Sequence, residues 1–391
     1  MAERTRSYLR GRFGDFYRRS APPEPPDATA REWGYIPFEG GPGTTMVRHR
    51  SVHDLGSLSA FLLRERPRHV YFSAGRYADP SARSMDDKDW QGSDLVFDLD
   101  ADHLPAVTPE EDSYAEMLAA CKDALLRLLD LLDRDFGFED LQITFSGGRG
   151  YHVHVRDLGI QALSREQRRE VVEYVRGSGI SLEALLTEEP VAGHGRKTPT
   201  TRRTLPTDGG WSRRVVERLR SLTDELLALE ETAAVERLTA FEGVGEKTAR
   251  AVLSVLEENT DAVRAGNVDV HPAFLPVVRA TIERTVRADS AAIDEPVTTD
   301  THRLIRLPGS LHGGTGLRVV PLEREALADF DPLSDAIPET FRGHRIGVEV
   351  EEPRELTFDG ESISVGQGYQ ELPEYAGIFL MARGWAEKAP E

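Results

Sequence analysis

The sequence has one cysteine, Cys121, among its 391 residues. A single thiol cannot form an internal disulfide, hold an iron–sulfur cluster or complete a multi-thiolate zinc site. Long apolar runs are also missing: none approaches the roughly 18–20 residues of a membrane-spanning helix, and the N-terminal segment lacks the apolar stretch of a signal peptide. We therefore expect a cytoplasmic protein with no membrane partner.

Lysine is scarce too. The chain carries 48 basic and 67 acidic residues, a formal net charge of −19, and only five of the basic residues are lysines. An acidic surface with little lysine is typical of proteins in concentrated salt, where net charge maintains solubility and the salt screens the repulsion. We interpret the composition as salt adaptation. Because phosphate binding normally requires a basic face, local clusters must carry any function on nucleic acid.

The order of the predicted elements indicates an α/β (α+β) fold with mixed sheets, interrupted by helices. The length suggests about two domains. From 181 to 289 helical periodicity dominates and strand alternation nearly disappears, so we predict an all-α inserted subdomain there, with 1–180 and 290–391 forming the two parts of one core. Strands are predicted at 31–35, 45–50, 68–72, 94–100, 142–145, 151–155, 303–306, 317–320 and 345–350, and helices at 114–132 and 375–382.

Asp98 and Asp100 stand two residues apart in a run that alternates apolar and polar positions, so both carboxylates leave the same face of a strand. Hard oxygen ligands suit Mg²⁺ or Mn²⁺, and two such ions about 3.5–4 Å apart stabilise the attacking and leaving oxygens of a phosphoryl displacement. Taken alone, such a pair is more often a solvated strand end. A third carboxylate from elsewhere would complete the site.

A glycine-rich turn, Ser146-Gly-Gly-Arg149-Gly-Tyr-His152, joins two predicted strands. Its exposed N–H groups, arginine, hydroxyl and imidazole could bind phosphate, and a tight hairpin with a surface arginine is the alternative. His154, on the same strand face as His152, is more easily a structural histidine. Cys121 falls in the apolar stripe of the helix at 114–132 and is expected in the core.

A third cluster combines a carboxylate, Asp294, with Arg303, Arg306 and the glycine-flanked His312. Near an acidic metal site these cations would neutralise a triphosphate, whereas on a plain surface they would only be solvated. Spacing alone does not decide between the two.

Two features of the insertion could contact nucleic acid. The densest cationic stretch contains Arg196, Lys197, Arg202 and Arg203, and either follows a nucleic-acid backbone or is a solvated loop. The segment 238–250 resembles a helix-hairpin-helix, whose glycine turn presents N–H groups to a DNA phosphate. With a single copy, an ordinary tight turn between helices is the favoured interpretation.

Together these clusters resemble the small catalytic subunit of archaeal and eukaryotic DNA primases, and the archaeal form most closely. The resemblance is carried by REWGY (31–35), Arg48 in TMVRHRS, DLVFDLDADHL (94–104), FSGGRGYHVHV (145–155) and IDEPVTTDTHRLIRLPGSLHGGTGL (293–317). It implies the archaeo-eukaryotic primase catalytic core and the synthesis of short RNA, or also DNA, primers on single-stranded DNA from nucleoside triphosphates. It further implies a heterodimer with an iron–sulfur large subunit.

Carried over position by position, the resemblance assigns two kinds of site residue. The catalytic carboxylates that would hold Mg²⁺ or Mn²⁺ are Asp98, Asp100 and Asp294. The nucleotide ligands are Arg48, Ser146, Arg149, His152, Arg306 and His312. Arg306 stands where some relatives have lysine, which keeps the charge and changes the hydrogen-bond geometry.

One departure and two alternatives accompany the resemblance. Many family members hold a structural zinc after the aspartate strand, but 102–121 offers one cysteine and one histidine, so we expect no structural zinc. The alternatives are a stand-alone repair or end-joining polymerase of the same superfamily and a non-catalytic single-strand-binding subunit. The second of these leaves the three aspartates unexplained.

Overall fold

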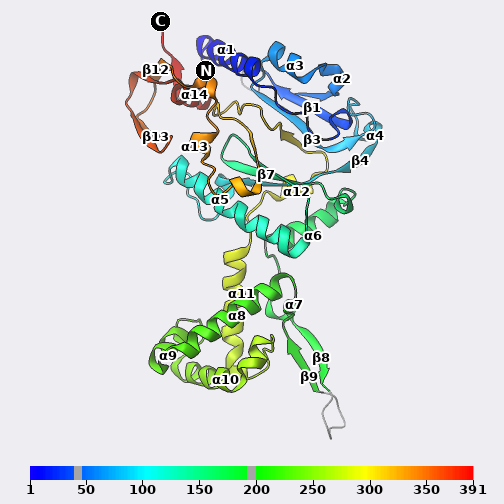
Figure 1. Cartoon of the computed structure of the whole chain (residues 1–391), viewed down its shortest axis with the longest axis vertical. Helices are drawn as coiled ribbons and strands as arrows, with labels where there is room; N and C mark the ends of the chain where they lie inside the picture. The colour runs from blue at the N-terminus through cyan, green and yellow to red at the C-terminus, as the bar shows by residue number, and fades with distance from the viewer. Residues whose placement is uncertain (39–45, 192–199, 391) are drawn as a thin grey trace. The chain divides into compact units, whose positions relative to one another are not determined.

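The computed structural model describes residues 1–38, 46–191 and 200–390, with the backbone alone at 189–191 and 200–202 (Figure 1). The chain forms two compact units. The first contains 1–126, 138–172 and 292–391, and the second contains 127–137 and 173–291. Helices and antiparallel sheets together confirm the predicted α/β (α+β) class.

One sheet of the first unit draws strands from both ends of the sequence. Its order is β10 (Leu304–Arg306), β3 (His69–Tyr77), β1 (Arg31–Ile36) and β2 (Val47–Arg50), and β4 (Trp90–Ser93) also pairs with β3. In the antiparallel pair of β10 with β3, Arg306 lies opposite Tyr71. The prediction that the first and last parts of the chain share a core is therefore confirmed.

A second sheet carries the aspartate strand. Its order is β11 (Val320–Leu322), β6 (Leu141–Phe145), β7 (Gly150–Val155) and β5 (Leu95–Asp100). The predicted strand, glycine turn and strand are confirmed in β6 and β7. The strand predicted at 317–320 is displaced to β11, because Arg318 instead forms an isolated bridge with Leu311.

The helices of the first unit bury apolar stripes. Cys121 lies within α5 (Tyr114–Leu131), fully buried, with its thiol donating to the carbonyl of Leu99 at 3.6 Å, so its core role is confirmed. The other helices of at least eight residues are α1 (Glu3–Arg19), α3 (Leu58–Glu65), α6 (Arg165–Val175) and α14 (Glu374–Arg383). Shorter helices are α2 (Val52–Leu55), α4 (Met85–Lys88), α12 (Glu295–Thr299) and α13 (Pro332–Asp335).

The C-terminal segment folds onto its own small sheet. The strand β12 (Arg345–Val350) lies between β15 (Gly368–Pro373) and β16 (Ala386–Lys388), and α14 packs against it (Figure 1). The hairpin of β13 (Arg354–Phe358) and β14 (Glu361–Val365) completes this region. The predicted closing helix at 375–382 is confirmed as the central part of α14.

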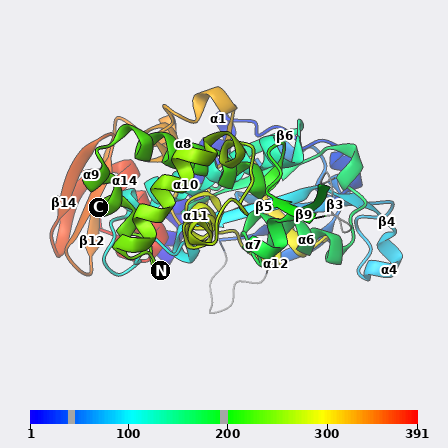
Figure 2. The same cartoon turned by 90° about the horizontal axis from the view of Figure 1, so that it is seen from below.

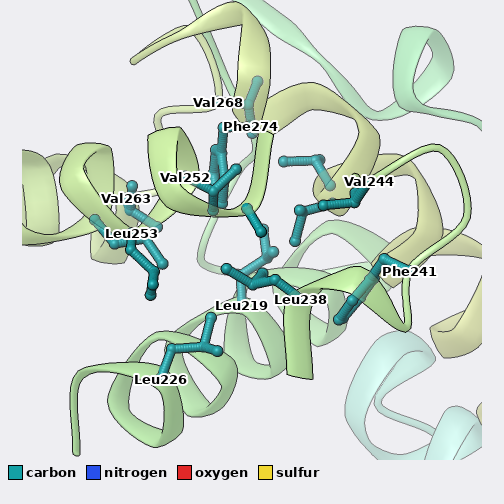
Figure 3. Close-up of a cluster of buried hydrophobic side chains, with 14 of the residues drawn as sticks. Leu219, Leu226, Leu238, Phe241, Val244, Val252, Leu253, Val263, Val268 and Phe274 are labelled. Carbon is teal, nitrogen blue, oxygen red and sulfur yellow. The ribbon is translucent and has the colours of Figure 1, made fainter. Parts of the chain in front are cut away.

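The second unit has a core of its own. Its main helices are α8 (Gly210–Ala228), α9 (Glu231–Thr239), α10 (Glu246–Arg264) and α11 (Leu275–Asp289), with α10 and α11 both packing on α8 (Figure 2). Figure 3 shows buried side chains of this core converging, among them Leu219 of α8, Leu238 of α9 and Phe274 of the short turn before α11. A short helix, α7 (Leu182–Leu185), precedes them.

The prediction of an all-α insertion is wrong. The second unit also contains a hairpin of β8 (Thr187–Val191) and β9 (Thr200–Thr204). These strands place polar and charged residues opposite one another, as in the pair of Glu188 with Arg203. Cross-strand pairs of opposite charge stabilise a solvated hairpin without any apolar alternation, so hydrophobic periodicity provides no signal for it.

Within the described ranges, no helix is both long enough and apolar enough to cross a bilayer.

Candidate active site

Three carboxylates gather where β5 ends. Asp98 and Asp100 are its last two polar positions, and the backbone N–H of Asp294 donates to the carbonyl of Asp98 at 2.9 Å. That contact sets Asp294, which precedes α12, beside the strand. Burial, followed by the charges of Asp100 and Asp294, raises the pKa of Asp98 to about 7. The third carboxylate required by the sequence argument is therefore present.

The carboxylates have the chemistry of a divalent metal site without a closed geometry. No three Asp, Glu, His or Cys side chains of the described residues converge closely enough to form a ready ligand group. The donors are nonetheless all hard oxygens, and the repulsion that raises the pKa of Asp98 is what a divalent cation would neutralise. In their chemistry the residues therefore fit Mg²⁺ or Mn²⁺.

His152 lies directly opposite Asp98 in the β5–β7 pair. Its Nε2 is 3.3 Å from Asp98 Oδ1, while Nδ1 is buried with no hydrogen-bond partner among the described residues. Burial, and then the charge of Arg306, holds the pKa of His152 well below its usual range. The imidazole is therefore neutral and retains a polar atom for a further ligand.

The glycine turn between β6 and β7 is sterically constrained. Gly147 has φ +73°, and a Cβ on Gly150 would lie 1.7 Å from the carbonyl oxygen of Leu99. The hydroxyl of Ser146 accepts from the N–H of Gly148 at 3.2 Å. Arg149 extends from the turn to Asp102, with Nη2 at 2.5 Å from Oδ2. Glycine is needed at position 150 because the backbone there passes so close to Leu99 of the aspartate strand.

Arg306 and His312 are each held by contacts with neighbouring side chains. The guanidinium of Arg306 donates to the hydroxyl of Tyr71 at 3.1 Å and lies 3.0 Å from Nδ1 of His69. His312 Nδ1 is 3.1 Å from the hydroxyl of Thr315. Burial, and then the charge of Arg306, lowers the pKa of His312 well below its usual range.

Two cavities collect the candidate site residues. The first has a volume of about 300 Å³, and the second, of about 380 Å³, shares Asp98, His152 and Arg306 with it. Arg48 lines the second, and Asp294 lines neither of these two cavities. The predicted residues lining the first are Asp98, Asp100, Ser146, Arg149, His152, Arg306 and His312. Residues far apart in the sequence thus line two neighbouring cavities that share Asp98, His152 and Arg306.

Arg48 is anchored from beneath by a buried carboxylate. Its Nε lies 3.1 Å from Glu32, which also accepts from the fully buried ammonium of Lys88 at 2.7 Å. Burial alone would raise the pKa of Glu32, but the hydrogen bonds from Lys88 and Arg48 outweigh it and lower the pKa. Glu32 belongs to the REWGY segment, and only the pairing of β1 with β2 shows its relation to Arg48.

His154 is a structural histidine, as expected. It is 1% exposed, and its Nδ1 lies 3.1 Å from Asp94, which also pairs with Arg31 at 2.9 Å and Arg156 at 3.1 Å. This network supports the beginning of β5 and lines neither cavity.

The cationic stretch of the insertion is only partly described. Arg196 and Lys197 lie outside the described residues, and Arg202 is described by its backbone in β9. Arg203 forms an ion pair with Asp269, Nη2 to Oδ1 at 2.6 Å. At 238–250, α9 and α10 flank a turn in which Gly243 has φ +77°, so the helices are confirmed while a role on DNA stays a prediction.

Carboxylates, arginines and imidazoles that line neighbouring cavities are the groups that a nucleotidyl-transferring class of enzyme requires. A family model described as DNA primase small subunit matches residues 97–324. The chain is 64% identical to DNA primase small subunit PriS of Halobacterium salinarum and 59% identical to that of Haloarcula marismortui, over 100% of each chain. With PriS of Methanococcoides burtonii it shares 39% identity over 99% of both chains. The chain belongs to the DNA primase small subunit family, and the resemblance expected from the motifs is confirmed.

Proposed function

We propose that this chain is the catalytic subunit of a DNA primase and makes short RNA primers, or also DNA primers, on single-stranded DNA. The single observation that carries the proposal is the convergence of the acidic strand β5, the glycine turn and β10 on shared cavities. In the three-aspartate cluster, the charges of Asp100 and Asp294 help raise the pKa of Asp98. A non-catalytic binding subunit would have no need of such a cluster.

The reaction joins a primer or initiating-nucleotide 3′-hydroxyl to the α-phosphate of an incoming nucleoside triphosphate and releases pyrophosphate. Asp98, Asp100 and Asp294 would hold Mg²⁺ or Mn²⁺, and the bound ions would activate the hydroxyl and neutralise charge. Arg149 and Arg306 bind the phosphates and offset the charge that develops on the leaving pyrophosphate. No protein nucleophile is required.

The neutral imidazoles have a separate duty. Burial keeps His152 and His312 uncharged, so each offers a directional hydrogen bond to phosphate rather than a second full cation. Ser146 and the N–H groups of its turn add neutral donors. Arg48, fixed by Glu32, extends the cationic lining into the adjoining cavity.

The partners follow from the family. We propose that the chain acts in the cytoplasm as a heterodimer with an iron–sulfur large subunit, on a single-stranded DNA template, with nucleoside triphosphates as substrates. Copurification with such a cluster-bearing partner distinguishes this assignment from a stand-alone repair or end-joining polymerase. Since 102–121 offers too few ligands, elemental analysis of the purified chain is expected to give no stoichiometric zinc.

The decisive experiment is primer synthesis on single-stranded DNA with labelled nucleotides and Mg²⁺ or Mn²⁺ in concentrated salt. Asp98→Asn is expected to abolish the product without unfolding the chain, whereas Asp123→Asn, an exposed aspartate on α5, serves as the matched control and keeps wild-type synthesis. Near-normal synthesis by Asp98→Asn would remove Asp98 from the mechanism. If wild type stays silent with a large subunit added yet binds single strands, the binding-subunit alternative holds.

A further inference from the structure

Arg383 lines the same cavity as the predicted phosphate ligands but belongs to none of the motifs. It ends α14, the helix whose core segment from Ala376 to Ala382 is buried. The next residue, Gly384, has φ +77°, and the N–H of Trp385 returns to the carbonyl of Leu380 at 2.9 Å. This C-terminal motif fixes the point at which the Arg383 side chain leaves the helix.

Three aromatic rings surround its guanidinium. The Cζ of Arg383 lies 4.5 Å from the ring centre of Tyr114, 4.6 Å from that of Phe379 and 4.9 Å from that of Trp385. The hydroxyl of Tyr114 donates to the carbonyl of Gly148 in the glycine turn. The cation is therefore oriented by stacking on the rings and is linked to the glycine turn through Tyr114.

The charge of Arg383, which is partly buried, lacks the hydrogen-bonded compensation that the buried Arg31 and Arg168 have. Arg31 pairs with Asp94 at 2.9 Å, and Arg168 donates to the carbonyls of Ser93 and Asp94, both at 2.9 Å. Arg383 forms no ion pair with a carboxylate of the described residues, and its Nε is buried without a hydrogen-bond partner. Asp102 acts on this charge without forming an ion pair with it. A partly desolvated cation that no carboxylate contacts directly is costly, and an anionic ligand would relieve that cost.

We propose that Arg383 is a further binding residue for the triphosphate of the incoming nucleotide, acting with Arg149 and Arg306 in their shared cavity. The inference rests on the proposed function, because it takes that cavity to be the nucleotide site. Its ligand is a polyphosphate chain, which a stacked, planar guanidinium binds through two parallel hydrogen bonds. The positive charge of Arg383 also acts on His312, since Arg383 is one of the cations that lower the pKa of His312.

The chain offers a matched control in Arg354. Its Cζ lies 4.1 Å from the Trp385 ring centre, so it stacks on the same aromatic group. Arg354 lines a neighbouring cavity of about 420 Å³ and does not line the cavity of about 300 Å³ that holds Arg149 and Arg306, whereas Arg383 lines both. A general loss of packing around Trp385 would affect both arginine variants, and a loss of phosphate binding would affect only Arg383.

The test measures binding of inorganic tripolyphosphate to the full chain by calorimetry in molar KCl, together with nucleotide KM and kcat in primer synthesis. Arg383→Gln should weaken tripolyphosphate binding and raise the nucleotide KM about tenfold, with a smaller change in kcat. Arg383→Lys should show a smaller loss, because it keeps the charge without the planar fork. Arg354→Gln should bind as wild type does.

Each other outcome is decisive. Wild-type binding by Arg383→Gln, beside weakened binding by Arg306→Gln, overturns this inference and leaves the proposed function intact. Absence of tripolyphosphate and nucleotide binding in the wild-type chain overturns both. If Arg383→Gln unfolds, Arg383→Lys decides: weaker binding at an unchanged thermal midpoint supports the assignment, and unchanged binding refutes it.

Discussion

Asp98 occupies a position that opposes its own ionisation. It is enclosed by β5, β7 and α12, where Asp100, Asp294 and His152 face it together with Arg303 and Arg306. Burial and the two neighbouring carboxylates outweigh the arginines and raise its pKa from the ordinary value to about 7. The folded chain therefore binds this proton more tightly than the unfolded chain does.

A pH dependence of stability follows for the metal-free protein. Because the folded-state pKa is the higher one, Asp98 makes the free energy of unfolding fall as pH rises from about 4 to about 7. Asp98→Asn removes this contribution, so we expect the variant to gain stability relative to wild type at pH 8 compared with pH 5. Urea unfolding of both proteins in EDTA at the two pH values measures it, and an identical difference at both would contradict the electrostatic account.

Single residues differ in how far the sequence could predict them. The alternation around Asp98 and Asp100 is local, so it revealed their strand and shared face without tertiary information. The anchor of Arg48 depends on Glu32 and Lys88, which are 56 positions apart and meet only after folding. Arg383 was missed for the same reason, because Tyr114, whose ring it approaches, belongs to α5 and meets α14 only after folding.

The pairing of β5 with β7 is the element that aligns acid and imidazole. Asp98 lies opposite His152, and Asp100 opposite Gly150, so a shift of one residue would turn the carboxylates to the other face. Gly150 forms the last pair of the two strands, and a Cβ at this position would clash with the carbonyl oxygen of Leu99. Close backbone approach at Gly150 is therefore a condition of the site geometry.

Gly150→Ala tests that condition. The added methyl cannot be accommodated without moving backbone, so we expect a loss of at least about 3 kcal/mol in the free energy of unfolding, together with loss of primer synthesis. Gly159→Ala is the matched control: no atom lies within 4 Å of the position that its methyl would take and its φ is not positive, so its change should stay within about 1 kcal/mol. Chemical denaturation of the two variants makes the comparison, and equal stability would show that the strands tolerate separation.

Elements with apolar periodicity were predictable, and elements held by charge or by long-range contact were not. The helix at 114–132 followed from the spacing of its apolar residues, and the closing helix followed from its apolar segment at 375–382. The charged hairpin of β8 and β9 has no such pattern. The helix α1 was not predicted because its buried residues Leu9, Phe13 and Tyr17 are interspersed with many arginines.

For the whole molecule, the net charge of −19 contributes self-repulsion that favours expansion in dilute buffer. Several of the cations that oppose this repulsion already pair with carboxylates. Arg31 and Lys88 form buried ion pairs, and Arg203 and Arg237 form ion pairs on the surface. Relatives in Halobacterium and Haloarcula agree with an origin in concentrated salt. Screening by salt, rather than added lysine, is then the means of limiting repulsion.

The expected result is a chain that unfolds in low salt and refolds in molar KCl, with a thermal midpoint that rises with salt. Glu110→Gln with Glu111→Gln removes two charges from exposed adjacent residues, so the salt concentration needed for folding should fall. Circular dichroism across a KCl series measures both midpoints, and sucrose at matched water activity serves as the uncharged control. Stability independent of KCl would refute salt adaptation. An equal response to sucrose would instead assign the effect to water exclusion rather than to screening of the acidic surface.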